Sequence, residues 1–116
     1  MVQPQKKENT KYVTALSICK IFNKSQYPNM LSNNELAAEY IRSSHLQNPE
    51  KVGEPWCTHS QMIRYYNKNR EWVVEVHQYL RKDGSIGASG LPEPKRLRIG
   101  NVIYIADTQG KRKISK

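Results

Sequence analysis

The chain has 116 residues, of which 37% are hydrophobic, and its formal net charge at pH 7 is +9. This length suits one domain, and the apolar content is too high for a fully disordered chain. Two cysteines, Cys19 and Cys57, are too few for a disulfide framework, and no apolar run approaches the ~20 residues of a membrane span. The first residues also lack the apolar core of a signal peptide, so we expect reduced thiols, a cytoplasmic location and no membrane partner.

The positive charge is concentrated in the second half of the chain. Residues 1–58 contain seven Lys/Arg and five Asp/Glu, whereas residues 59–116 contain twelve and five. A basic folded region attracts polyanions, so this asymmetry favours a nucleic-acid partner.

The domain limits follow from the polarity of the two ends. Residues 1–9 are polar and charged and predict a flexible tail, and residues 109–116 predict a basic tail. Neither segment can bury enough apolar surface to offset its ordering entropy. Residues 10–108 are therefore expected to form a single globular domain.

The first element within this domain is expected over residues 10–22. Five side chains recur there at helical spacing, although its Thr, Val and Ile residues also suit a strand. They are Tyr12, Ala15, Leu16, Cys19 and Phe22.

Two further helices are predicted from their start signals. Ser32 followed by Glu35 matches a capping box, and the helix is expected to end near His45. Thr58 followed by Gln61 is a second match, which predicts a third helix running towards residue 70.

Residues 70–82 fit two patterns. Trp72, Val73, Val76, Tyr79 and Leu80 fit helical offsets, while strand alternation and three valines fit a strand almost as well. We favour the helix because the pair Asp83-Gly84 then supplies a stop signal.

The remaining segments predict a loop and a hairpin. Residues 83–94 contain three glycines and two prolines and are expected to form a long loop. Residues 95–99 and 102–106 flank Gly100-Asn101, which predicts a two-residue β-turn. The expected fold class is α+β: a small, mostly helical domain of three to four helices with a C-terminal β-hairpin, similar to a winged helix.

Element order and charge together predict contacts with the phosphate backbone of DNA or RNA. The third helix, the hairpin and the C-terminal tail would supply the cations, and two tyrosines could stack on bases. The cations are Arg64, Lys68, Arg70, Lys95, Arg96, Arg98, Lys111 and Arg112, and the tyrosines are Tyr65 and Tyr66.

Two other functions stay open. The basic face could dock on an acidic protein surface as an accessory or inhibitory module. A small nuclease could be built around His77 with Glu71 and Glu75, with Arg81 and Lys82 as phosphate ligands, although Glu71 and Glu75 also fit a solvated face. No motif assigns a catalytic residue, and the sequence does not indicate the oligomeric state.

Cofactor and metal signals are weak. The segment Gly84–Gly90 lacks the lysine of a nucleotide-binding loop, so a loop that needs small residues explains it more simply than a phosphate site or a segment that orders on a partner. His45, His59 and His77 are scattered and lack zinc-ligand spacing. We therefore expect neither a cofactor nor a metal.

Overall fold

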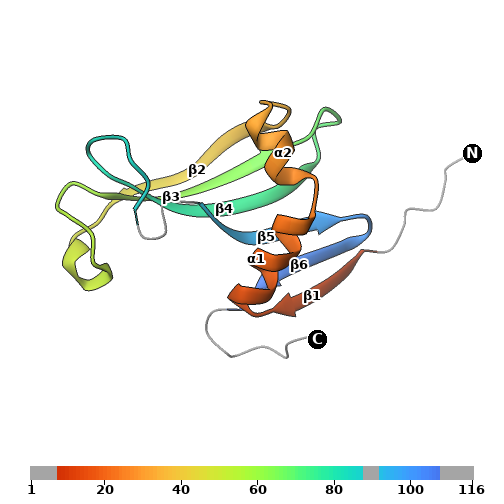
Figure 1. Cartoon of the computed structure of the whole chain (residues 1–116), viewed down its shortest axis with the longest axis horizontal. Coiled ribbons are helices and arrows are strands. Elements are labelled where there is room, and N and C mark those ends of the chain that lie inside the picture. The colour runs from red at the N-terminus through yellow and green to blue at the C-terminus, as the bar shows by residue number, and fades with distance from the viewer. Residues whose placement is uncertain (1–7, 88–91, 108–116) are drawn as a thin grey trace, which may run out of the picture.

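The computed structural model describes residues 8–87 and 92–107 (Figure 1). The elements in chain order are β1 (Asn9–Val13), α1 (Ala15–Lys24), α2 (Tyr27–Ser32), β2 (Ala37–His45), a 3-10 turn η1 (Pro49–Val52), β3 (His59–Tyr66), β4 (Trp72–Leu80), β5 (Glu93–Ile99) and β6 (Val102–Ala106).

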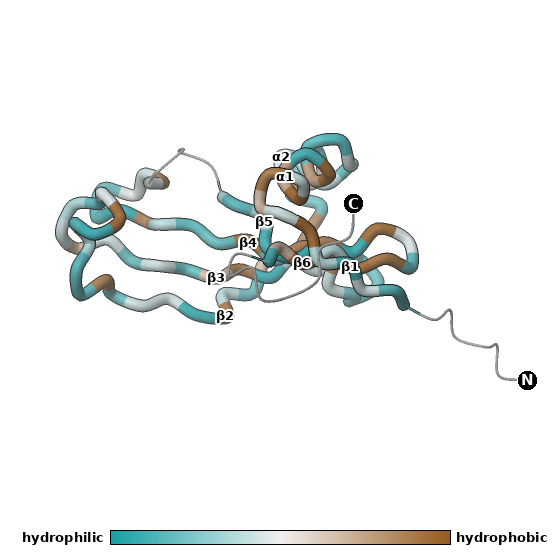
Figure 2. The backbone as a smooth tube through the Cα atoms, turned by 90° about the horizontal axis from the view of Figure 1, so that it is seen from below, coloured by the Kyte–Doolittle hydropathy of each residue, from teal (hydrophilic) through white to brown (hydrophobic). Residues whose placement is uncertain are grey.

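The strands form one six-stranded mixed sheet in the order β1-β6-β5-β4-β3-β2. All neighbours are antiparallel except β1, which pairs with β6 in parallel. The chain therefore passes from one edge of the sheet to the other through α1 and α2, and both helices lie on the same face (Figure 2). Among the described residues, no helix is both long enough and apolar enough to cross a membrane.

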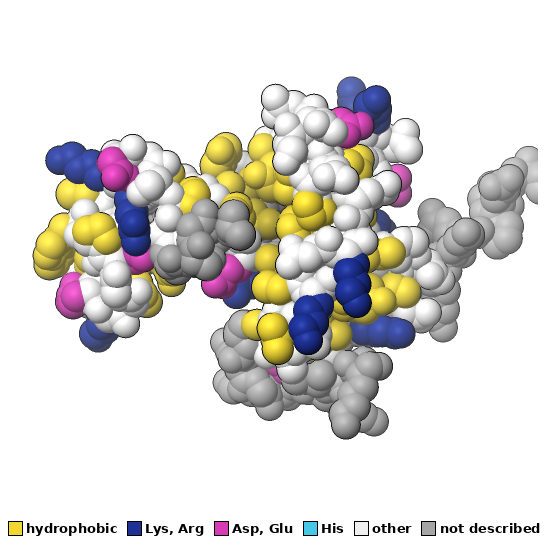
Figure 3. Space-filling model, viewed as in Figure 1, with side chains coloured by type: hydrophobic (Ala, Val, Ile, Leu, Met, Phe, Trp, Pro, Cys, Tyr) yellow, Lys and Arg dark blue, Asp and Glu magenta, His cyan; other side chains and the backbone are white. Residues whose placement is uncertain are grey.

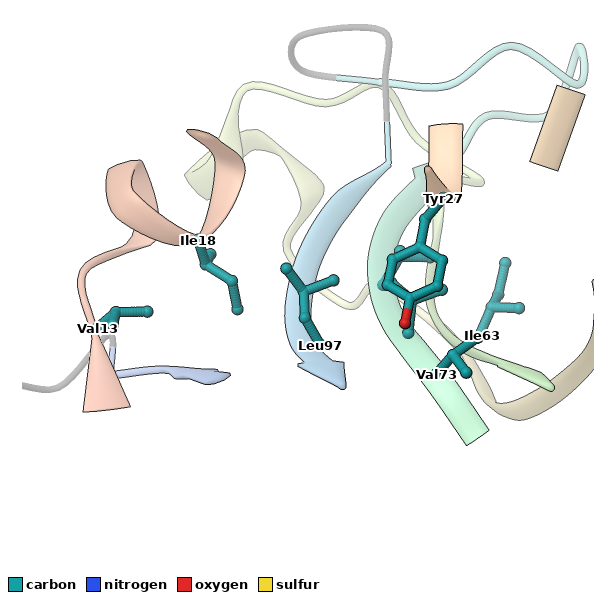
Figure 4. Packing of buried hydrophobic residues seen from close by; sticks show 8 residues of the cluster. Val13, Ile18, Tyr27, Ile63, Val73 and Leu97 are labelled. Carbon is teal, nitrogen blue, oxygen red and sulfur yellow. The ribbon is translucent and has the colours of Figure 1, made fainter. Parts of the chain in front are cut away.

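The core lies between α1 and the β4–β5 part of the sheet (Figure 4). Ile18 points from α1 towards Leu97 of β5, and both are fully buried. Burial of an aliphatic side chain of this kind stabilises a fold by roughly 1.5–3 kcal/mol. The other buried apolar residues of the cluster are Val13, Tyr27, Ile63, Val73, Val74 and Val76.

This architecture contradicts the expected fold class. The described residues form six strands, two helices and one 3-10 turn, so the three-to-four-helix domain was wrong and the winged-helix likeness falls with it. Long-range strand pairing outweighed the local helix signals, as tertiary context commonly does.

Residues 10–22 divide between two elements. Tyr12 and Val13 belong to β1, and the helix begins only after Thr14, whose Oγ1 accepts a hydrogen bond from the Ser17 N–H at 3.0 Å. This N-cap satisfies one of the amides that a helix start leaves unpaired. The β-branched residues ahead of Thr14 extend instead.

The first capping-box match is the end of a helix and not a start. Asn34 has a left-handed φ of 56°, and its N–H bonds to the Leu31 carbonyl. The Glu35 N–H bonds to the Met30 carbonyl at 2.9 Å. These two bonds form a Schellman motif that ends α2 at Ser32, and the segment predicted as the second helix becomes β2.

The second capping-box match precedes a strand. The Thr58 side chain is fully buried, and its hydroxyl donates to the Pro55 carbonyl at 2.8 Å instead of capping a helix. The residues of the predicted third helix form β3, which pairs with β2 on one side and β4 on the other.

Residues 70–82 contain β4, so our preference for a helix was wrong. A bulge explains the helical spacing: Tyr65 pairs with Val74 and Tyr66 with Trp72, which leaves Val73 as an extra residue. Val73 and Val74 are consequently both buried. Glu75 and Val76 are buried as well, so burial does not alternate along this part of β4, and its apolar residues imitate a helical pattern.

The predicted hairpin is confirmed in β5 and β6. Gly100 takes a φ of +61°, as two-residue hairpin turns require. Strand β5 starts at Glu93, so the expected loop is shorter than predicted. Ile86 of this loop forms a β-bridge with Leu80 at the end of β4. Residues 88–91 lie outside the described residues.

Candidate functional site

A pocket of about 830 Å³ lies between the two helices and the β2–β4 half of the sheet. Hydrophobic side chains gather beside α2 in the same region of the surface (Figure 3). Its described lining comes from α1, α2, the α2–β2 connection, strands β2 to β5 and the residue before β5. These lining residues are Cys19, Phe22, Asn23, Pro28, Leu31, Ser32, Asn34, Leu36, Ala38, Tyr65, Val76, Pro92, Glu93 and Pro94.

The pocket exists because the helices cover only part of the sheet face. Helix α1 packs on β5 and β6, and Ile18 anchors it there against Leu97. Ala38, Tyr65 and Val74 lie in one register row with Leu97 and so share the helix-bearing face. The small side chain of Ala38 leaves space beside Tyr65, which helps to keep the pocket open.

Few polar groups line this pocket. The side chains of Asn23, Ser32 and Asn34 and the Tyr65 hydroxyl make no hydrogen bond with any described residue. Burial, with a smaller contribution from Tyr40, raises the pKa of Tyr65, so its hydroxyl is a neutral donor at pH 7. Among the described lining residues, Glu93 alone carries a charge.

Two of the predicted cations, Arg64 of β3 and Arg96 of β5, lie on the opposite face of the sheet. Arg64, Glu75 and Arg96 are register neighbours on that face. Arg64 bonds to the Glu75 carboxylate at 3.1 Å, and Arg96 lies 4.0 Å from it. The Glu75 side chain is only 10% exposed, so water screens its charge little. This carboxylate therefore partly neutralises both arginines.

Arg98 and Lys95 also have acidic neighbours. The Arg98 guanidinium lies 2.6 Å from Glu8 and 4.7 Å from the centre of the Trp72 ring. Lys95 lies 3.4 Å from Glu93. The four cations of the hairpin and β3 therefore do not form a purely cationic surface.

The remaining predicted contacts are dispersed. Lys68 and Arg70 are exposed in the β3–β4 turn, and Lys111 and Arg112 lie outside the described residues. Tyr65 and Tyr66 point to opposite faces because successive strand residues alternate: Tyr65 lines the pocket, and the Tyr66 hydroxyl donates to Glu39 at 2.8 Å.

The residues of the nuclease hypothesis are also separated. The His77 Nε2 lies 2.7 Å from the Ser60 hydroxyl, while Glu71 lies at the other end of β4, before Trp72. Glu75 binds Arg64, and Arg81 binds Glu54 at 2.8 Å. Burial, followed by nearby Lys95, lowers the pKa of His77.

Within residues 8–87 and 92–107, no group of three or more His, Cys, Asp or Glu side chains is placed to hold a metal ion. The ring centres of His45 and His59 lie 4.6 Å apart, and Cys57 is exposed. In the described part of the chain these side chains do not form a group of three metal ligands. Comparisons of the chain with protein-family models, with curated proteins and with solved structures found no match.

Sequence reasoning missed the pocket. Its lining residues come from helices and strands that are distant in the chain, so no local spacing marks them. Only a correct pairing of β2 with β3 would have placed Ala38 beside Tyr65 on the helix-bearing face.

Proposed function

We propose that the protein binds a small, largely apolar and uncharged molecule in the pocket between α1, α2 and the sheet. The supporting observation is the pocket itself: its volume of about 830 Å³ suits a drug-sized ligand, and its lining is mostly apolar. Four polar side chains without described partners, those of Asn23, Ser32, Asn34 and Tyr65, are available to orient such a ligand.

The charge of the lining narrows the ligand class. No Lys or Arg is among the described lining residues, despite the net charge of +9. Glu93 pairs in register with His77, on the face away from the helices, and its 51% exposed side chain lies beside Lys95, so its charge is partly neutralised outside the pocket. A neutral molecule with one acceptor group for the Tyr65 hydroxyl fits these features best.

A neutral apolar dye with a carbonyl acceptor, Nile red, tests this proposal. Its fluorescence should rise saturably with one site per chain. Ala38→Trp fills the pocket from β2 and should weaken binding at least tenfold. Tyr65→Phe, which removes one hydrogen bond, should weaken it about two- to tenfold.

Ala37→Trp is the matched control. Ala37 precedes Ala38 on β2, is also exposed, and pairs with Tyr66 on the other face of the sheet. This variant should bind the dye like the wild type, with folding checked by circular dichroism. Equal binding by the two tryptophan variants, or no saturable binding by the wild type, would contradict the proposal.

A second candidate is binding of DNA or RNA on the face away from the helices. Its specific support is that Arg64, Arg96 and Arg98 share that face, with Trp72 beside Arg98. An open sheet face with arginines and aromatic rings suits single strands. The Glu75 carboxylate lies between Arg64 and Arg96, and its negative charge would weaken the binding of a polyanion there.

Fluorescence anisotropy with a labelled single-stranded oligonucleotide tests this second candidate. Glu75→Gln should tighten binding because it removes a competing anion, and affinity should fall steeply with salt. Arg96→Ala should weaken binding more than Lys20→Ala, which removes an exposed cation from α1. No binding at low salt would exclude this function.

A further inference from the structure

Strand β2 is an unusually open edge of the sheet. It ends the strand order, and all nine of its residues are exposed. Tyr40 is 62% exposed and Ile41 43% exposed at its centre. An edge strand presents unpaired backbone N–H and C=O groups, and a long edge with apolar side chains is a template for another strand.

The opposite edge lacks these properties. Strand β1 has five residues, including Lys11, and short edge strands with lysine discourage pairing. In Figure 1 the two edges lie on opposite sides of the sheet, with β2 the longer. No described strand pairs with the outer side of β2.

The charges of β2 are self-complementary. A bulge at Ile41 interrupts the pairing with β3 between Tyr40 and Arg42. Glu39 pairs with Arg64, and Arg42 pairs with Met62, so the bulge puts Glu39 and Arg42 on the same face, away from the helices. They have opposite charges and flank the two exposed apolar residues.

Arg42 and Glu39 both have capacity for a further partner. Arg42 forms no ion pair with any residue in the described part of the chain. Glu39 accepts one hydrogen bond, from Tyr66 through Oε1, and a carboxylate can accept several more.

From these observations we propose that β2 pairs with β2 of a second copy, antiparallel and about a two-fold axis between Tyr40 and Ile41. This is the one antiparallel register that sets Glu39 of each copy opposite Arg42 of the other. Tyr40 then faces Ile41 of the other copy, which pairs the exposed apolar side chains, and Ala38 faces Ser43. A two-fold contact is isologous and closes after two copies.

Sedimentation equilibrium of the full chain over about 10–500 µM measures the association. The wild type should show a reversible dimer of the 13.5 kDa chain. Glu39→Arg and Arg42→Glu each replace two attractive cross-strand pairs by repulsive ones, so each should weaken dimerisation about tenfold or more.

Combining the charge reversals gives the decisive test. An equimolar mixture of the Glu39→Arg and Arg42→Glu proteins should form a heterodimer because every cross-strand pair is again opposite in charge. The double variant should likewise regain self-association. No rescue in either case would overturn the proposed register.

Two controls separate this pairing from other effects. Tyr66→Phe removes the hydrogen bond that Glu39 accepts but leaves the negative charge of Glu39 in place. Lys11→Glu reverses a charge on β1, at the opposite edge of the sheet. Both should dimerise like the wild type. A monomeric wild type over the whole concentration range, or loss of the dimer in Lys11→Glu alone, would overturn the proposal.

Discussion

The Glu54 carboxylate occupies the space that a side chain on residue 87 would need. A Cβ added to Gly87 would lie 2.3 Å from Oε1 of Glu54. The Glu54 side chain is 1% exposed and bonds to Arg81 at 2.8 Å, so it cannot move away freely. This contact pins the connection between β2 and β3 against the segment after β4.

We therefore expect Gly87→Ala to lower the free energy of unfolding by about 1–3 kcal/mol, as overpacking commonly does. In a Glu54→Ala background the same change should cost little, because the obstructing carboxylate is gone. Urea denaturation of the four proteins gives the coupling energy. As a control, Gly84→Ala should be destabilising in both backgrounds, since Gly84 has a φ of +88° and open space around it. Additive effects at residues 54 and 87 would refute the steric explanation.

His77 should make stability depend on pH. Its folded-state pKa lies below the usual 6.5 because of burial and then Lys95, with Glu93 acting in the opposite direction. The unfolded state therefore binds the proton first. Stability from this residue is present above about pH 6.5 and falls as pH drops through the lower folded-state value.

Urea denaturation at pH 7.5 and 5.5 measures this effect. His77→Gln should reduce the difference between the two pH values, and an unchanged difference would count against the assignment. In NMR titration, Lys95→Met should raise the pKa of His77, whereas Lys68→Met, in the distant β3–β4 turn, should leave it unchanged.

Tyr27 joins α2 to the hairpin. Its hydroxyl donates to the Arg98 carbonyl, and burial raises its pKa. Tyr27→Phe leaves that carbonyl without this donor and should cost about 1–2 kcal/mol of stability. Tyr40→Phe, on the exposed edge strand, should change the urea midpoint much less. Equal effects of the two substitutions would mean that the hydrogen bond contributes no net stability.

The end of α2 gives a direct test of its motif. If Asn34 is the left-handed residue of a Schellman motif, Asn34→Ala should destabilise by about 1 kcal/mol, and Asn34→Gly should be neutral or stabilising. Ser32→Ala should have little effect, although a helix N-cap there would lose about 1 kcal/mol. Thermal unfolding of the three variants distinguishes the motifs, and the reverse order of effects would favour the capping box.

The β5–β6 hairpin shows what the sequence by itself determined. Its signal is local: a Gly-Asn turn between two short alternating runs, where neighbouring residues pair with each other. The length and composition likewise favoured one domain. The helix cap at Thr14 is also a local signal, and it marks the boundary between β1 and α1 within residues 10–22. These features need no information about distant parts of the chain.

Only the tertiary structure decided the identities of β2, β3 and β4 and the place of the pocket. Ser32–Glu35 and Thr58–Gln61 both have the sequence of a capping box, but the first lies at the end of a helix and the second before a strand. In β4, the bulge at Val73 interrupts the alternation that would have indicated a strand. Whether Arg64 contacts solvent or Glu75, and whether Tyr65 lines a pocket, depends on which strands lie side by side. Strand pairing over long sequence separations is a collective property of the fold, so no single segment specifies it.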